Sequence, residues 1–227
     1  MQEDNSLIAL TNPGDSASEF FNFEILPPAF DPTLRNSYSR TNAMWLMELC
    51  RLVYRRDGIQ PSREDFLKQH DLHEVVFFNA DRTQGALVTN KNFGVLVFRG
   101  TLGAGDWLSD LDGIQTNWIG EGKVHKGFKD QLELVWNNLI PELDKLTVPV
   151  FYTGHSLGAA LATLAAARRF VEGKTPAAAL YTFGSPRLGT TGFIHAFPSN
   201  FLHCRVVNDA DTVPTVPPRT FDVGTFT

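Results

Sequence analysis

Residues 148–160 read Val-Pro-Val-Phe-Tyr-Thr-Gly-His-Ser-Leu-Gly-Ala-Ala, and this stretch decides the fold class. Its first six residues predict a buried strand, whose proline stands at the entrance, where a strand tolerates it. The alanine-rich run Leu157–Val171 predicts a helix. Between them, Gly154-His155-Ser156-Leu157-Gly158 is a G-x-S-x-G pattern, which is typical of a strained strand–turn–helix that presents a serine. We therefore expect an exposed Ser156 hydroxyl, and two glycines whose replacement would cause collisions with a neighbouring strand and helix.

Other apolar segments on both sides predict strands that alternate with helices. The expected strands are 75–78, 85–89, 94–98, 178–183 and 201–207, of which the first three form a meander and the last two are buried. The expected helices are 41–56, capped by Ser39 or Thr41, and 127–145, which Pro141 ends or bends. This alternation predicts an α/β fold with a mostly parallel central sheet flanked by helices.

Length and composition fit one sizeable domain and narrow the function classes. The 227 residues carry a net charge of −5 and no basic cluster, so we expect no nucleic-acid partner. Two cysteines without a zinc-ligand pattern lead us to expect no metal, and no motif points to a cofactor. No apolar run reaches the roughly 18 residues of a transmembrane segment. Residues 1–35 are polar and interrupted by proline, so we expect an N-terminal arm followed by a domain over 36–227.

The start of the chain shows neither the cationic head nor the apolar core of a secretory signal. A cytoplasmic protein and the mature form of a secreted one both stay open.

A nucleophilic serine needs a base to take its proton and an acid to orient that base. In α/β hydrolases the acid and then the histidine follow the serine along the chain. The acidic residues that follow Ser156 and could serve as the acid are Glu172, Asp209, Asp211 and Asp222. Glu172 is excluded, because it belongs to the far end of the helix that begins after Ser156, whereas Asp209 and Asp211 directly follow the last predicted strand. None of the six histidines follows Asp211, and His195, on a loop, is the least implausible substitute.

The developing oxyanion needs hydrogen-bond donors. The backbone N–H of Leu157 is one candidate, because it follows the nucleophile and begins a helix. Thr101, after the strand 94–98, is the second candidate, and the alternative is that it only turns the chain. From 102 to 119 apolar residues recur near helical spacing, which predicts either an amphipathic lid over the site or an ordinary core-facing helix.

Six blocks of this sequence together resemble the class 3 (fungal-type) triacylglycerol lipases of the α/β-hydrolase fold. They are Val97–Thr101, Trp107–Leu111, Val124–Phe128, Thr153–Ala160, Tyr181–Gly189 and Arg205–Pro214. The resemblance implies that Ser156 is the nucleophile, that Asp211 is the acid, and that Thr101 and Leu157 donate to the oxyanion. It also implies that the lid lies within residues 102–112.

Family members carry the catalytic histidine some tens of residues after the Val-Pro segment that corresponds to Val213-Pro214. The present sequence reaches Thr227 without one. We therefore expect the hydrolase domain to lack its C-terminal end here.

Two functions follow as hypotheses. The first is a serine esterase that cleaves lipid esters such as triacylglycerols through an acyl-enzyme, with a lipid or small ester as substrate and a lipid–water interface as its setting. Phospholipase A1 and feruloyl esterase activities stay open within this class. The alternative is a catalytically incomplete hydrolase fold that binds a lipid or a partner, because no histidine follows Asp211.

Overall fold

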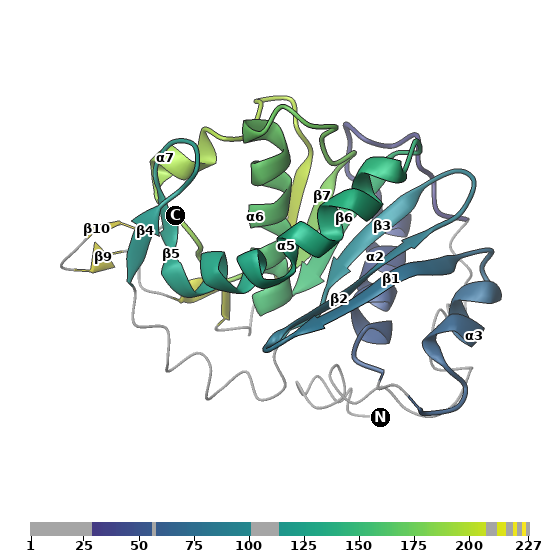
Figure 1. Cartoon of the computed structure of the whole chain (residues 1–227). Coiled ribbons are helices and arrows are strands. Elements are labelled where there is room, and N and C mark those ends of the chain that lie inside the picture. The colour runs from purple at the N-terminus through teal and green to yellow at the C-terminus, as the bar shows by residue number, and fades with distance from the viewer. Residues whose placement is uncertain are drawn as a thin grey trace, which may run out of the picture.

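A six-stranded sheet forms the centre of the molecule, with its strands in the order β1-β2-β3-β6-β7-β8 (Figure 1). The computed structural model describes residues 29–55, 58–100, 114–207, 213–216, 220–221 and 224–225. The strands of this sheet are β1 (His73–Ala80), β2 (Thr83–Thr89), β3 (Gly94–Phe98), β6 (Val150–His155), β7 (Leu180–Phe183) and β8 (His203–Val206).

The sheet changes character at β3. Its first three strands are antiparallel, which confirms the predicted meander, and β3, β6, β7 and β8 run parallel. Phe98 pairs with Gly154, so the end of β3 lies beside the end of β6 although these residues are 56 positions apart in the sequence. Every residue of β3 is buried, as expected for a strand covered on both faces. The predicted mostly parallel sheet is thus confirmed.

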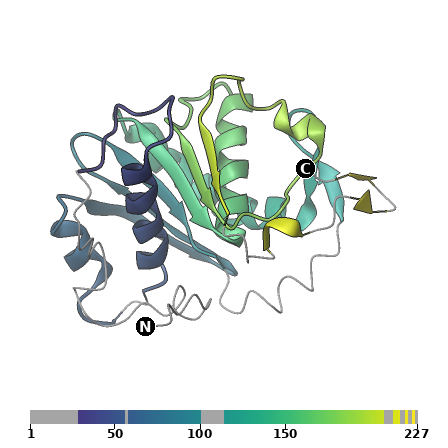
Figure 2. The same ribbon diagram turned by 180° about the vertical axis from the view of Figure 1, so that it is seen from behind.

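Helices cover both faces of the sheet. Helices α5 (Lys126–Lys145) and α6 (Leu157–Val171) cover one face, and α2 (Arg40–Leu52) covers the other, as the view from behind shows (Figure 2). The Ser39 side chain caps α2, in agreement with one of the two predicted caps. Helix α5 passes through Pro141 and continues to Lys145, because Pro141 and Asn137 face solvent, where water can satisfy the carbonyl that proline leaves without a donor.

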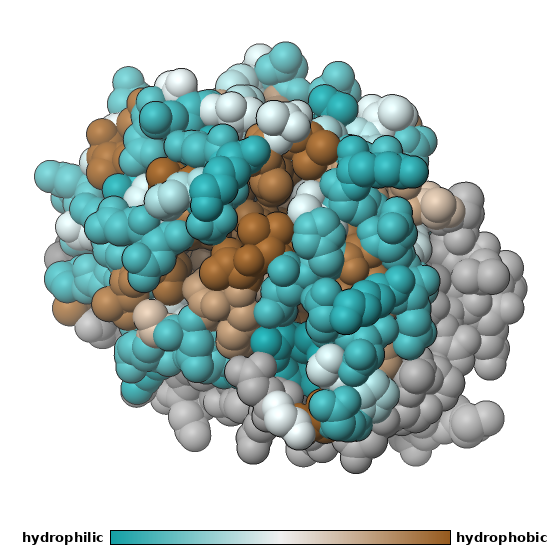
Figure 3. Space-filling model, turned by 45° about the vertical axis from the view of Figure 1, so that its right-hand side comes forward, coloured by the Kyte–Doolittle hydropathy of each residue, from teal (hydrophilic) through white to brown (hydrophobic). Residues whose placement is uncertain are grey.

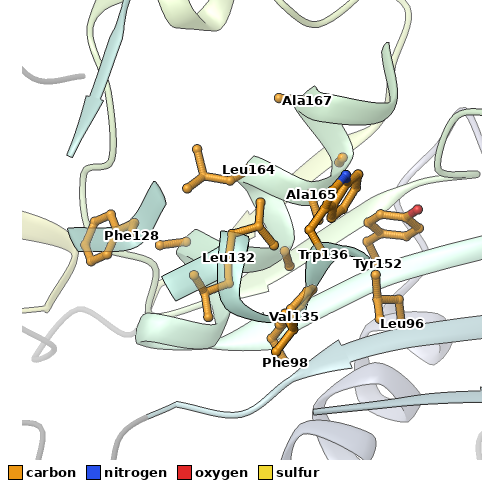
Figure 4. Close-up of a cluster of buried hydrophobic side chains, with 14 of the residues drawn as sticks. Leu96, Phe98, Phe128, Leu132, Val135, Trp136, Tyr152, Leu164, Ala165 and Ala167 are labelled. Carbon is orange, nitrogen blue, oxygen red and sulfur yellow. The ribbon is translucent and has the colours of Figure 1, made fainter. Parts of the chain in front are cut away.

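Two hydrophobic layers hold the helices on the sheet. On the α5–α6 side, Phe98 and Tyr152 of the sheet pack against Leu132 and Trp136 of α5 (Figure 4). Between Ala159 and Ala167, α6 is buried and consists mostly of alanines. These small side chains allow the helix to lie close to the sheet. On the α2 side, the buried leucines of the helix face Val97 and Phe151. Each large side chain buried in this way stabilises the fold by roughly 1.5–3 kcal/mol.

Strand β8 differs from its prediction. The run 201–207 was expected to be a buried strand, but Val206 and Val207 are 36% and 48% exposed. The reason is its position at the edge of the sheet, where only β7 pairs with it among the described residues. The apolar run therefore predicted correctly that this segment forms a strand, but the prediction that the strand is buried was wrong.

Several short elements were not predicted. They are α3 (Arg63–Lys68), β4 (Gln115–Asn117), β5 (Lys123–His125), α7 (Thr191–Ile194), a 3-10 turn (Val213–Thr215), and the β9–β10 pair (Thr220–Phe221 and Gly224–Thr225). Helix α3 had a signal in the sequence, because Ser62 and Asp65 form a capping box at its start.

The opposite edge of the sheet, β1, is also only partly covered. Val75 and Val76 are half-buried, and a view with β1 and α3 turned forward shows apolar surface between polar side chains (Figure 3). Near the beginning of the described chain, Phe30 stacks on Phe93, with ring centroids 4.3 Å apart. None of the helices in the described ranges has the length and apolar character of a membrane span.

Candidate active site

Ser156 occupies a sharp turn between β6 and α6. Its backbone has φ 55° and ψ −124°, a conformation that residues with a side chain rarely adopt. Its N–H donates to the Phe183 carbonyl of β7 at 2.9 Å, which fixes the turn to the neighbouring strand. The predicted strand–turn–helix is therefore confirmed, with α6 beginning at Leu157.

The two glycines of the G-x-S-x-G pattern permit this turn by allowing close packing. A Cβ atom at Gly154 would lie 2.2 Å from the carbonyl oxygen of Gly158 in α6. A Cβ atom at Gly158 would lie 2.2 Å from the carbonyl oxygen of Phe98 in β3. Both distances are far inside van der Waals contact, so the predicted collisions with helix and strand are confirmed.

The expectation of an exposed hydroxyl is wrong. Ser156 is 1% exposed, and its Oγ makes no hydrogen bond within the described part of the chain. Crowding at the ends of the strands contributes to this burial, because a Cβ atom at Gly100 would lie 3.3 Å from Cβ of Ser156. A buried hydroxyl without a partner is costly, which marks it as a group with a role other than stability.

Of the two predicted oxyanion donors, only Leu157 lies in the described part of the chain. Leu157 is buried and is the first residue of α6, so its N–H has no acceptor within the helix and lies at the positive end of the helix dipole. Thr101 lies outside the described residues. The chain is described as far as Gly100, two residues beyond the end of β3.

Asp211 and Asp209 also lie outside the described residues. Strand β8, which leads to them, is parallel to β6 and β7, and Val206 pairs with Phe183, which in turn pairs with His155. The chain therefore arrives at residue 207 at the same edge of the sheet that carries Ser156. This is the edge at which open α/β sheets place their sites.

The predicted lid, residues 102–112, lies outside the described residues. The end of the same helical pattern is described and is not helical: Gln115–Asn117 is strand β4, paired with β5. Trp118 is buried and packs edge-on against Phe193, with ring centroids 5.6 Å apart. Ile114 and Trp118 are thus spaced as in a helix, but they stand on either side of strand β4, and Trp118 holds the end of that strand by being buried.

The histidines of the sequence all lie in described parts of the chain. His195 lines a surface cavity of about 450 Å³ together with Phe170 and Val171, at the far end of α6.

 Helix α6 is 15 residues long and spans about 22 Å at 1.5 Å per residue, so His195 lies too far from Ser156 to act as its base.

The other histidines near the sheet have different contacts. The His155 ring lies beside Tyr54, as expected for a side chain that does not serve the adjacent serine. His203 lies 3.4 Å from the Thr182 hydroxyl, and His125 packs against Phe128. Ser156 Oγ has no hydrogen-bond partner in the described ranges, so none of these histidines is hydrogen-bonded to it. In the same ranges, no three His, Cys, Asp or Glu side chains gather in a way that would hold a metal ion.

Tyr54 is a residue of this site that the sequence analysis missed. It follows α2 in the sequence, yet its hydroxyl lies 3.3 Å from Nδ1 of His155. Burial raises the pKa of Tyr54 far above its ordinary value, so the phenol stays neutral. No pattern in the sequence connects a residue at a helix end with a serine about 100 positions later.

A mostly parallel sheet, helices on both faces, and a serine on a strained turn between a central strand and a helix define the class of protein. It has the α/β-hydrolase fold, with Ser156 on the sharp turn, or elbow, between β6 and α6. The family model described as lipase (class 3) matches residues 95–221. The chain belongs to this family.

Comparison with known proteins agrees with this placement. The chain is 35% identical to a lipase of Rhizomucor miehei over 137 residues, which are 56% of this chain and 38% of the relative. It superposes on lipase II of Rhizopus niveus with a TM-score of 0.62 and 26% identity, covering 72% of this chain and 66% of that structure.

A third similar structure is that of a triacylglycerol lipase whose catalytic centre is described as a serine protease triad. The TM-score is 0.62 at 29% identity, with 70% of this chain and 64% of that chain covered. The chain thus spans about two fifths of the length of the curated relative from Rhizomucor and somewhat less than two thirds of these structures.

Proposed function

We propose that this chain provides the nucleophile, the acid and the oxyanion donors of a serine esterase that cleaves lipid esters. Ser156 is the nucleophile, Asp211 is the acid, and the backbone N–H groups of Thr101 and Leu157 bind the oxyanion. The observation that carries the proposal is the strained, buried turn at Ser156, whose hydroxyl has no hydrogen-bond partner among the described residues. Backbone strain of this kind costs about 1–3 kcal/mol and persists at sites where function requires it.

The reaction follows from this geometry. The Ser156 oxygen attacks the ester carbonyl carbon as a base takes the hydroxyl proton, and the carbonyl oxygen becomes an oxyanion. The Leu157 N–H, at the first turn of α6, stabilises that charge. When the C–O bond of the ester breaks, the proton passes to the leaving alcohol and Ser156 is acylated. Water then attacks the acyl group, which releases the acid and restores the serine.

The class of substrate rests on the family. One similar structure is described as a triacylglycerol lipase, and a relative from Penicillium camembertii is described as a secreted mono- and diacylglycerol lipase. We infer that acylglycerols or related lipid esters are the substrates, presented at a lipid–water interface. The segment 102–112 is our candidate for the lid, because its apolar residues recur near helical spacing.

Covalent labelling tests the nucleophile directly. A fluorophosphonate probe is expected to label the chain at Ser156, and Ser156→Ala is expected to abolish the label. Ser185→Ala is the matched control, because Ser185 is also buried but its hydroxyl already donates to the Pro186 carbonyl at 3.1 Å. Label that persists in Ser156→Ala would remove Ser156 as the nucleophile.

A second candidate function is a hydrolase fold that binds a lipid or a partner without turnover. This candidate is favoured because all six histidines lie in the described residues and none of them is hydrogen-bonded to the Ser156 hydroxyl. This candidate predicts binding of a fluorescent fatty acid together with no labelling by the phosphonate, even when imidazole is added to replace a base. Labelling that appears or accelerates with imidazole would instead support the esterase.

A further inference from the structure

The Tyr54 side chain lies between two parts of the candidate site that come from distant strands. The first part is the turn at Ser156, where the neighbouring His155 ring places Nδ1 3.3 Å from the tyrosine hydroxyl. The second part is the end of β3, where a Cβ atom at Gly100 would lie only 2.4 Å from the same oxygen. Tyr54 is 5% exposed, so both contacts are shielded from water.

The Tyr54 hydroxyl contacts both parts of the site. The Gly100 backbone lies against the phenolic oxygen, and its N–H is the backbone group that can donate to that oxygen. The hydroxyl proton is then directed to Nδ1 of His155, which accepts it when the imidazole carries its own proton on Nε2. The Arg99 guanidinium lies 5.6 Å from the centroid of the tyrosine ring and holds the ring from a third side.

Resting on the proposed function, we infer that Tyr54 is a positioning residue of the active site. Its hydroxyl links Gly100, just beyond the end of β3, to His155, the residue before the proposed nucleophile Ser156. The link sets the distance between the turn at Ser156 and the end of β3 at Gly100, which belong to two different strands. Tyr54 itself does not touch the substrate, and its contribution is to hold those two groups at one separation.

The test compares Tyr54→Phe with Tyr181→Phe. Both tyrosines are buried and both hydroxyls lie against the backbone, that of Tyr54 against Gly100 and that of Tyr181 against Ser39, whose N–H donates to it at 3.1 Å. Only the first hydroxyl lies beside the elbow. The control therefore reproduces the loss of a buried hydrogen bond without affecting the site.

Turnover of a soluble p-nitrophenyl ester is the first readout. We expect Tyr54→Phe to lower kcat by about 10- to 100-fold with little change in KM, because a small misplacement of catalytic groups acts on the transition state. Tyr181→Phe is expected to keep the kcat of the unmodified chain. Equal kcat values for the two variants would overturn the positioning role.

Hydrogen exchange at the Gly100 amide is the second readout, and it does not depend on activity. Tyr54→Phe is expected to speed this exchange by about ten-fold or more, while Tyr181→Phe speeds exchange at Ser39 and leaves Gly100 unchanged. An unchanged Gly100 amide in Tyr54→Phe overturns the inference. If the unmodified chain neither hydrolyses the ester nor reacts with a phosphonate, the proposed function fails, and the Gly100 amide still decides whether Tyr54 links the two strands.

Discussion

The Arg169 guanidinium lies 2.7 Å from the Asp144 carboxylate and thereby joins α6 to the end of α5. The arginine side chain is 3% exposed, whereas the aspartate is 39% exposed. Arg169 also donates through Nε to the Thr175 carbonyl at 3.0 Å, so its charge is held by two partners at the end of α6 opposite Ser156.

Replacing the carboxylate of this pair should be costly. Asp144→Ala leaves a buried guanidinium with less compensation, and we expect a loss of about 2–3 kcal/mol in the free energy of unfolding, because one partner is partly exposed. Glu142→Ala is the control, since Glu142 pairs with the exposed Lys145 and should cost less than about 1 kcal/mol. Urea unfolding measures both variants, and equal losses would contradict the difference in burial.

Gly158→Ala tests the close approach of α6 to β3. The added Cβ would lie 2.2 Å from the Phe98 carbonyl oxygen, which is backbone and cannot move aside. We expect a loss of at least about 3 kcal/mol or failure to fold. Gly173→Ala is the matched control, because its φ of +62° is strained for alanine but no atom lies within 4 Å, so about 1–2 kcal/mol is expected. Circular dichroism during urea titration reports both, and a mild Gly158→Ala would disprove the clash.

Ser156→Gly should make the protein more stable. The serine has φ 55° and makes no capping hydrogen bond with its side chain, so glycine relieves strain without removing a contact. We expect a gain of about 1 kcal/mol in the free energy of unfolding. Ser156→Ala keeps the Cβ atom and should show no such gain. If the glycine variant is the less stable of the two, the turn is not strained.

His70 should make stability depend on pH. Burial lowers the pKa of His70 below its ordinary value, and its ring packs edge-on against Trp45. The unfolded chain then binds a proton at a higher pH than the folded one, so stability is complete above the unfolded pKa of about 6.5 and falls as the pH drops below it.

Urea unfolding at about pH 7.5 and about pH 5.5 measures this effect while carboxylates stay largely ionised. His70→Phe retains a ring beside Trp45 and cannot titrate, so we expect it to reduce the loss of stability at the lower pH. A loss of the same size in both proteins would show that other groups cause it.

The central part of the fold was predictable because its sequence signals are local. The run before Gly154 and the alanines after Ser156 predicted β6 and α6 within two residues of their observed bounds. The burial of β8 was not predictable, because an apolar run has the same appearance at the edge and in the middle of a sheet. The helical pattern behind the lid prediction extends to Trp118. Residues 115–117 of this pattern form strand β4, so the helical spacing of the apolar residues beside it does not indicate a helix.

The candidate site was predictable only in part. Ser156 and Leu157 follow from one pentapeptide and from the start of a helix, and the structure brings them together at the edge of the sheet. Asp211 and Thr101 stay predictions, since they lie outside the described residues. The contact of Tyr54 with His155 depends on how α2 crosses the sheet, which is a property of the packing and has no signature in the sequence.

The change of strand direction at β3 also determines how the protein reaches its native state. The antiparallel strands β1, β2 and β3 are neighbours in the sequence, so their hairpins need only short loop closures. The pairing of β3 with β6 must wait for a crossover of about 50 residues, whose closure is slower. We therefore expect the meander to form early and the turn that carries Ser156 to be assembled late, as a product of the folding transition and not its nucleus.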